Sequence, residues 1–389
     1  MKGLYDVEGM VTLAGSAIRR GGPPADRDAG LVQRLKASDA ILVGALNMDE
    51  FAYGFSTENA HYGATRNPHD RARMCGGSSG ASAAAVAAGL LPLTLGSDTN
   101  GSIRVPAAFC GVFGMKPTFG RLSRSGVFPL SASLDHTGHF ARTVADLALA
   151  YDLMQGPDPR DLALADRAAE PATPGLDAPL GNLRVGVLDG WFQHGAADEV
   201  LEARDLAATA FKGVRTVRLP EVERARAAAF CITAAEGGAL HLDDLAVRPE
   251  AFDPATRDRL IAGALAPAAA VIAAQRFRQW FRLEVAKVLE DVDVLIAPAT
   301  PCVAPRFDQQ AMSFQGEPVP VRSILGLYTQ PISFIGLPVV AAPVRRRGLP
   351  VAVQIITRPW AEALGLRVAR HMERAGVLAA AEPPPVMAH

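Results

Sequence analysis

The stretch from Gly76 to Ser97 constrains the fold most, because it is 22 residues long and carries no charged side chain. A segment of that length could cross a bilayer. Only 11 of its 22 residues are apolar, however, and five glycines, four serines and a proline make up most of the remainder. A membrane span would be richer in leucine, isoleucine, valine and phenylalanine. We therefore expect this stretch inside a globular core and not in a membrane.

The same stretch predicts a helix that runs into a strand. Its alanines at 81–88 favour a helix that Gly89 ends, and the apolar run 90–96 predicts a buried strand. Similar elements recur elsewhere, with a helix and a strand over 30–46, helical sequence over 258–290, and strands over 183–190, 293–301 and 348–356. Repeated alternation of this kind predicts a mixed α/β core.

Composition and charge narrow the class of protein. The chain has 389 residues, of which 49% are hydrophobic, which suffices for a large core. Its net charge of −1 gives no global signal for nucleic-acid binding. Four scattered cysteines without a paired spacing predict neither disulfides nor a metal site, and we expect no cofactor. The N-terminal sequence MKGLYDVEG lacks the apolar segment of a signal peptide, so we expect a cytoplasmic protein.

A proline-rich segment divides the chain. Five prolines fall between residues 155 and 182, which indicates an exposed connection. It separates a first half, residues 1–154, from a second half, residues 183–389, which begins with a new predicted strand.

Familiar nucleophile and phosphate motifs do not fit the chain. It has no GxSxG sequence between a strand and a helix, and no spacing supports a Ser-His-Asp triad. The Gly/Ser block lacks the lysine of a phosphate-binding P-loop. In a third scheme a neutral lysine takes a proton from the nucleophilic serine through a second serine. This scheme needs small residues around the serines, so that the backbone can approach the substrate, and a loop of free N–H groups that can hold an oxyanion. CGGSSGAS and GSDTNGSIRVPAAFCG supply both, although a glycine-rich helix entry packed on a strand explains them too.

Two adjoining motifs resemble the amidase signature family. They are GGSSGASAAAVAAG at 76–89 and LGSDTNGSIRVPAAFCGVFGMKPTFGRLS at 95–123. Flanking stretches resemble the family as well: VGALNMDEFAYG, SLDHTGHFARTVADLA, DVLIAPATP and YTQPISFIGLP. The resemblance implies a single α/β domain over residues 1–389, with a mixed central β-sheet flanked by helices on both faces. It also implies an amidase that hydrolyses linear C–N bonds.

The resemblance assigns three catalytic residues, because the family uses a Ser–cis-Ser–Lys triad. The nucleophile is Ser102 in NGSIR, and the bridging serine is Ser78, the first of the GGSSG pair. Ser79 is then a neighbour that supports the loop. The stretch MKGLYDVEGMVTLAGS matches the one that contains the family's lysine base, which assigns the base to Lys2. This scheme needs a buried Lys2, because burial lowers the pKa of a lysine.

The resemblance also implies an oxyanion hole and two flanking charges. Asp98 and Arg104 flank the nucleophile loop, and we expect them to pair as scaffold charges. Asn100 stands where many members have glycine, so its side chain should narrow the site. The oxyanion hole consists of the main-chain N–H groups of Thr99, Asn100, Gly101 and Ser102.

The start of the chain departs from the family pattern. Family members carry several tens of residues ahead of this lysine, whereas Lys2 follows the first residue. Order is usually poorest at a chain terminus, so a base at this position is unexpected. We hypothesise a lost or unrecorded N-terminal segment, and a truncated, inactive relative is one of the alternatives.

Several details resemble a narrower branch, which removes ammonia from 1-carboxybiuret in cyanuric acid degradation and works with a small accessory subunit. They are SDTNGSIRVPA, NMDEFAYGFSTENAHYG, ALAYDLMQGPDPRD and YTQPISFIGLP. The alternative is the glutamine-hydrolysing subunit of a tRNA-dependent amidotransferase. We expect an oligomer without direct contact to nucleic acid or membrane. A small anionic ureido substrate needs a cationic or amide-rich pocket, for which the motifs offer Tyr53, Tyr328, Gln330 and His136.

Overall fold

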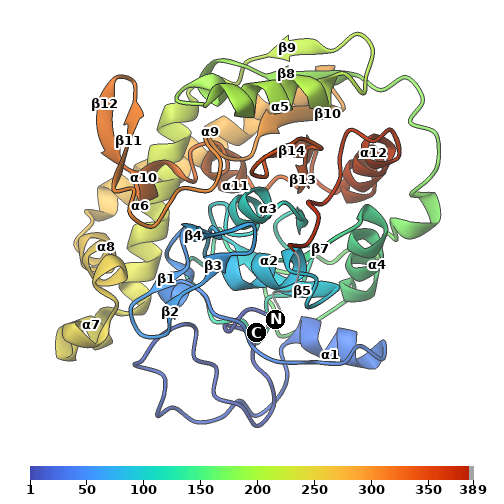
Figure 1. Ribbon diagram of the computed structural model, residues 1–389. Helices are drawn as coiled ribbons and strands as arrows, with labels where there is room; N and C mark the ends of the chain where they lie inside the picture. Colours follow the sequence, from blue (N-terminus) through green and yellow to red (C-terminus); the bar gives the residue numbers. More distant parts are fainter. Residues whose placement is uncertain (385–389) are drawn as a thin grey trace.

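A mixed eight-stranded sheet forms the centre of the computed structural model, which describes residues 1–384 (Figure 1). Its strands are β5 Leu93–Asp98, β6 Phe113–Lys116, β7 His136–Ala141, β8 Val185–Leu188, β9 Arg215–Val217, β10 Val294–Pro298, β13 Val339–Pro343 and β14 Ala352–Thr357. Their order is β5-β7-β6-β13-β14-β10-β8-β9. β8 pairs in parallel with β10 and β9, whereas the other neighbours are antiparallel.

Helices cover both faces of this sheet, as the alternation along β13 shows. Successive side chains of a strand point to opposite faces. Val340 and Ala342 belong to a hydrophobic cluster with side chains of several helices, whereas Ala341 between them belongs to a cluster with side chains of two others. The first face carries α4 Val144–Met154, α5 Asp198–Ala208 and α12 Glu362–Arg374, and the second carries α2 Gly80–Ala87 and α3 Arg104–Cys110. The predicted α/β class with flanked faces is confirmed.

A helical group from the second half of the chain packs on the second face of the sheet, where it contacts Leu295, Ala297 and Val339. It contains α6 Val222–Leu240, α7 Leu242–Val247, α8 Pro254–Ala264, α9 Ala268–Asp291 and α11 Gln330–Phe334. α6 packs against α8, α9 and α11, and α6, α7 and α8 are visible at the left of Figure 1. The remaining α-helices are α1 Gly30–Ala37 and α10 Val321–Ile324. The remaining strands form the hairpins β1 Glu58–Asn59 with β2 Gly63–Ala64, β3 Arg66–Asn67 with β4 Asp70–Met74, and β11 Ala311–Phe314 with β12 Glu317–Pro320. Short 3-10 helices are η1 Glu50–Ala52, η2 Thr173–Gly175, η3 Gly190–Gln193 and η4 Pro249–Ala251.

Most of the predicted elements are confirmed, and two differ. The apolar run at 40–46 is not a strand, because only Leu46 finds a partner, in an isolated bridge with Lys2. Ile41 is 90% exposed, so the run has no neighbouring strand to complete a ladder. The helical sequence 258–290 is broken between α8 and α9 at Pro267, since the residue before a proline disfavours helical geometry.

The chain start is held inside the fold, contrary to the expectation for a terminus. The α-amino group of Met1 donates to the carbonyl of Gly44 at 3.1 Å. The N–H of Lys2 donates to the carbonyl of Leu95 in β5 at 3.0 Å. Lys2 is consequently fixed to the edge strand of the central sheet.

Membrane-span criteria are not met by any single helix in residues 1–384. Only α8 and α9 taken together, at a bend of 94°, reach the required length and hydropathy.

Candidate active site

Two serine-bearing loops lie next to each other at the end of β5. One precedes α2 and contains a cis peptide bond between Gly77 and Ser78. The other leads from β5 into α3 and carries Ser102. The N–H of Ser79 donates to the carbonyl of Ser102 at 3.3 Å, and the Ser79 hydroxyl donates to the carbonyl of Ser97 at 3.0 Å. Ser79 therefore ties both loops to the strand, as the neighbour role assigned to it requires.

Lys2 lies beneath these loops in contact with two serines. Its Nζ donates to Oγ of Ser78 at 2.7 Å and to Oγ of Ser97 at 2.8 Å. The side chain has no exposed surface. Burial lowers the pKa of Lys2 to about 7, although the carboxylates of Asp49 and Asp135 oppose this shift. A large share of Lys2 is therefore neutral near pH 7, and a neutral amine can accept a proton from Ser78.

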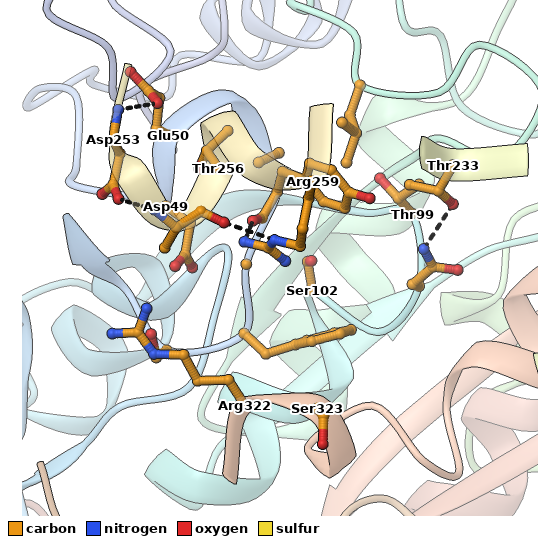
Figure 2. Close-up of a pocket in the computed structure, with 18 of the residues that line it drawn as sticks. Asp49, Glu50, Thr99, Ser102, Thr233, Asp253, Thr256, Arg259, Arg322 and Ser323 are labelled. Carbon is orange, nitrogen blue, oxygen red and sulfur yellow. Dashed lines mark hydrogen bonds between the residues drawn. The ribbon is translucent and has the colours of Figure 1, made fainter. Parts of the chain in front are cut away.

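Ser102 stands on the wall of a cavity of about 250 Å³ (Figure 2). Its hydroxyl forms no hydrogen bond with any of residues 1–384, so the oxygen is free to meet a carbonyl carbon that enters the cavity. Proton transfer from Ser102 through Ser78 to Lys2 would need a hydrogen bond between the two serine hydroxyls, and the structure shows none between them. Such contacts are often long in an empty site and tighten when substrate binds.

The predicted oxyanion donors are not equivalent in the structure. The N–H of Gly101 donates to Oδ1 of Asp98 at 2.7 Å, so it is already used. The N–H groups of Thr99, Asn100 and Ser102 form no hydrogen bond with residues 1–384. Among the four predicted donors, these three N–H groups are the ones that remain available next to Ser102.

Asp98 and Arg104 form a buried ion pair, as expected. The guanidinium donates to both carboxylate oxygens at 3.0 Å, and neither side chain is exposed. Burial alone would raise the pKa of Asp98, but the charge of Arg104 holds that pKa well below its usual value. The Asp98 carboxylate also accepts from the N–H groups of Gly101 and Ile103, at 2.7 and 3.2 Å. The pair thus supports the turn that carries Ser102.

Two of the four motif-based pocket candidates line the cavity and two do not. Tyr53 and Gln330 are on its wall. The hydroxyl of Tyr328 instead donates to the carbonyl of His194 at 2.7 Å, away from the cavity. His136 lies behind the nucleophile loop, where its ring Nδ1 is 3.1 Å from the carbonyl of Asp98. Position in a motif did not determine the direction of these side chains.

Sequence reasoning placed the side chain of Asn100 in the site, as the cavity lining confirms, but it missed two arginines and the partner of that side chain. Arg259 of α8 and Arg322 of α10 reach it from segments distant in sequence from the serine loops (Figure 2). The side chain of Asn100 reaches across to α6, where Nδ2 donates to Oγ1 of Thr233 at 2.8 Å. Its Oδ1 is buried and has no partner among residues 1–384. None of these features carries a local sequence signal, because each depends on how the helical group packs on the sheet.

A metal site is not evident in the described part of the chain. No group of three or more histidine, cysteine, aspartate or glutamate side chains in residues 1–384 is arranged to hold a metal ion.

A buried lysine of lowered pKa that contacts Ser78, next to a loop that places Ser102 on a cavity wall, is an arrangement suited to acyl transfer from an amide. A scan of family models agrees, since the model described as Amidase matches residues 1–366. The chain belongs to the amidase family of C–N hydrolases, and the predicted family is confirmed.

Among individual relatives, the chain is similar to the 1-carboxybiuret hydrolase subunit AtzE of Pseudomonas sp. (strain ADP). They share 54% identity over 380 residues, which cover 97% of this chain and 83% of the relative. A glutamyl-tRNA(Gln) amidotransferase subunit of Chloroflexus aurantiacus (strain ATCC 29366 / DSM 635 / J-10-fl) is 37% identical over 96% of this chain and 81% of its own length.

Solved structures agree with this placement. One belongs to a vestigial protein complex that reveals the evolutionary origins of an s-triazine catabolic enzyme. It superimposes with a TM-score of 0.95 at 53% identity, covering 98% of this chain and 84% of that one. The 6-aminohexanoate cyclic dimer hydrolase superimposes with a TM-score of 0.86 at 28% identity, over 98% and 85% of the two chains. The fold is therefore the amidase signature fold.

Proposed function

We propose that this protein hydrolyses the terminal C–N bond of 1-carboxybiuret, or of a closely related ureido acid, and releases ammonia. The observation that carries the proposal is the contact of Lys2 with Ser78 directly beneath the loop of Ser102. The similarity to the 1-carboxybiuret hydrolase subunit supports the choice of substrate. We assign the roles of base, bridge and nucleophile to Lys2, Ser78 and Ser102 respectively.

The acylation step uses these three side chains together. Neutral Lys2 takes the hydroxyl proton of Ser78, and Ser78 takes the proton of Ser102. The Ser102 oxygen then forms a bond to the terminal carbonyl carbon. The N–H groups of Thr99, Asn100 and Ser102 stabilise the negative oxygen of the tetrahedral intermediate. When the C–N bond breaks, the relayed proton passes to the leaving nitrogen and ammonia departs.

Deacylation repeats the relay with water as the nucleophile. Water gives a proton through Ser78 to Lys2, attacks the acyl carbon and breaks its bond to Ser102. The Ser102 oxygen takes the proton back, and the acid leaves. With 1-carboxybiuret as substrate, one water is consumed and the products are dicarboxyurea and ammonia. The relay ends with every protein group in its starting state.

The assembly in which this chain works is proposed from its relatives. The similar protein from Pseudomonas is one subunit of its enzyme, and the similar solved structure is a protein complex. We propose that this chain also works with a small accessory subunit in a cytoplasmic oligomer, without direct contact to nucleic acid. We further propose that residues 1–389 form a single amidase domain.

Ammonia release from candidate substrates tests the function. We would generate 1-carboxybiuret in situ by hydrolytic ring opening of cyanuric acid and measure ammonia with a coupled dehydrogenase. L-glutamine in a parallel reaction tests the amidotransferase alternative, which the 37% identity to the Chloroflexus amidotransferase keeps as the second candidate. Release from carboxybiuret but not from glutamine supports the proposal, and the reverse pattern rejects it.

Two variants determine whether the reaction uses the proposed serine. Ser102→Ala should lose ammonia release, because no nucleophile remains. Ser323→Ala is a matched control, since this serine lies at the exposed rim of the same cavity and its hydroxyl donates to the carbonyl of Pro320. It should keep the wild-type rate. Full activity of the Ser102→Ala variant would show that the nucleophile is assigned wrongly.

A further inference from the structure

Gln330 brings an amide group to the wall of the cavity that Ser102 lines. It is the first residue of α11, it lines the same cavity, and it is 1% exposed. Its Oε1 accepts a hydrogen bond from Nε of Arg226 at 2.8 Å. Its Nε2 has no hydrogen-bond partner among residues 1–384. One end of this amide is therefore satisfied by the protein, and the end that is not satisfied is a donor.

The contact with Arg226 fixes which end of the amide is free. A guanidinium carries only donors, so the oxygen of Gln330 has to face Arg226 and the nitrogen has to be the free end. Arg226 of α6 is itself held in place, because its Nη2 donates to the carbonyl of Ser323. The N–H bonds of Gln330 are consequently presented by a fixed side chain, and a fixed donor loses little entropy when an acceptor binds.

The amide of Gln330 lies close to the nucleophile loop. The preceding residue, Thr329, donates its hydroxyl to the carbonyl of Asn100 at 2.7 Å. A Cβ on Gly101 would lie 2.1 Å from that hydroxyl oxygen, so the loop and the start of α11 are in direct contact. Gln330 is therefore near the reacting end of a bound substrate and not at its far end.

Hydroxyl groups on the same cavity wall are already used inside the protein. Three of them donate to protein acceptors: Thr99 to the carboxylate of Asp135, Thr233 to the carbonyl of Ala229, and Ser323 to the carbonyl of Pro320. Nε2 of Gln330 differs from them, because it has no acceptor within residues 1–384. Since this donor is neutral, it can pair with a carbonyl oxygen without the cost of burying an unpaired charge.

We propose that Nε2 of Gln330 donates to the second carbonyl oxygen of the ureido acid, the one that follows the reacting carbonyl, and thereby selects acylureas over simple ureas and alkyl carboxamides. This inference rests on the proposed function and names a specificity residue of that site. In 1-carboxybiuret one nitrogen separates the two carbonyl carbons, which lie roughly 2.4 Å apart. The substrate thus offers an acceptor near its reacting carbon, where Gln330 lies. L-glutamine has methylene groups at this position and offers none.

Two ureido acids of equal length test this contact. Malonuric acid has the second carbonyl, whereas 3-ureidopropionic acid has a methylene group in its place, and both keep the terminal carboxylate. The measurement is the protection of Ser102 from a fluorophosphonate probe, relative to the unprotected labelling rate of the same protein. Malonuric acid should protect the wild type at concentrations about 3-fold to 10-fold lower, the usual effect of one neutral hydrogen bond. Equal protection by the two acids in the wild type would overturn the inference.

Two substitutions separate the donor role of Gln330 from its support of Arg226. Gln330→Met has a similar size and no donor at its end. Gln330→Glu keeps an oxygen for Arg226 and replaces the donor by a second acceptor, so it stays informative even where Gln330→Met does not fold. Both variants should lose the preference for malonuric acid. A wild-type preference in Gln330→Glu would overturn the proposal, because an ionised carboxylate has no hydrogen to donate.

A uniform loss of binding would also contradict the proposed contact. Equally weaker protection by both acids in the Gln330 variants, with the preference between them intact, would place the donor at the reacting carbonyl and overturn the assignment to the second one.

Gln33→Glu is a matched control for the change of charge. Oε1 of Gln33 on α1 also accepts from an arginine, Nη2 of Arg160, at 3.1 Å, and Gln33 does not line the cavity. This variant should keep the wild-type preference for malonuric acid. Loss of the preference in Gln33→Glu as well as in Gln330→Glu would overturn the proposal.

Turnover of 1-carboxybiuret separates failure of this inference from failure of the proposed function. In Gln330→Met, kcat/KM for this substrate should fall by up to about 10-fold. Selective protection by malonuric acid without hydrolysis of 1-carboxybiuret would reject the proposed substrate and retain the acylurea contact. Hydrolysis of 1-carboxybiuret by a wild type that both acids protect equally would retain the proposed function and overturn this inference.

Discussion

The pH dependence of Ser102 reactivity tests the proposed base directly, because Lys2 acts only in its neutral form. Burial lowers the pKa of Lys2 to about 7. With that pKa, the neutral fraction is about 10% at pH 6, about 50% at pH 7 and about 90% at pH 8. At the ordinary value of 10.5, only roughly 0.3% would be neutral at pH 8. Burial therefore increases the active fraction at pH 8 by about 300-fold.

The expected result is a rate of Ser102 labelling that rises with pH through a midpoint near 7. The assay is the second-order rate of fluorophosphonate labelling between about pH 5.5 and 9, read by intact mass with the modified residue located by peptide mapping. This probe requires an activated serine and no knowledge of the substrate. Deprotonation produces the base, so the rate rises and does not fall as pH increases.

A variant without the amine provides the control for this profile. Lys2→Ala should lower labelling by about 100-fold or more at pH 8 and remove the limb with its midpoint near 7, because general-base catalysis of this kind contributes about that much. A midpoint above about pH 9 in the wild type would refute the argument from burial. A wild-type profile retained in Lys2→Ala would show that another group is the base.

Three further predictions concern stability and the serine loops. Arg104→Met should lower the free energy of unfolding by about 3–5 kcal/mol in urea titrations, because it leaves Asp98 charged, buried and unpaired; recovery in the double variant with Asp98→Asn would confirm that cause. Lys2→Met should raise the free energy of unfolding at pH 7, and its advantage over the wild type should shrink towards pH 10. The pKa of Lys2 is lowered in the folded state, so the unfolded wild type binds more protons over this range and the wild type gains stability as pH rises. A pH-independent difference in melting temperature between the two proteins would contradict this prediction. Gly77→Ala should abolish Ser102 labelling while circular dichroism stays native, because its Cβ would lie 2.1 Å from Oδ2 of Asp49; labelling at the wild-type rate would reject this.

The sequence predicted those parts of the site in which local chemistry and structure coincide. The glycines, serines and alanines around Ser78 both form the loop before α2 and start the helix, so this one motif predicted the local structure and the catalytic residue together. The pairing of Asp98 with Arg104 was likewise predictable, since the two residues flank a single turn. The burial of Lys2 was not, because it depends on hydrogen bonds to Leu95 and other β5 residues rather than on its neighbours in sequence.

Long-range packing accounts for what could not be predicted. Arg259 reaches the cavity only because α8 packs on α6 and the helical group closes over the serine loops. The run at 40–46 has the composition of a strand, but a strand also requires a free partner, and Lys2 takes up the hydrogen bond at Leu95 on the β5 edge. Tyr328 belongs to a recognisable motif, yet the core around it directs its hydroxyl to His194.

One short strand explains how a site assembled from distant segments keeps its geometry. The carbonyl of Leu95 in β5 accepts the N–H of Lys2, and the hydroxyl of Ser97 accepts from its amine. The carbonyl of Ser97 also accepts the hydroxyl of Ser79, which holds the loop of Ser78, and the strand continues into the turn of Ser102. The proposed base, bridge and nucleophile are therefore each attached to β5 rather than only to one another. Because β5 is paired along its whole length with β7, a displacement of any one group would require distortion of the sheet.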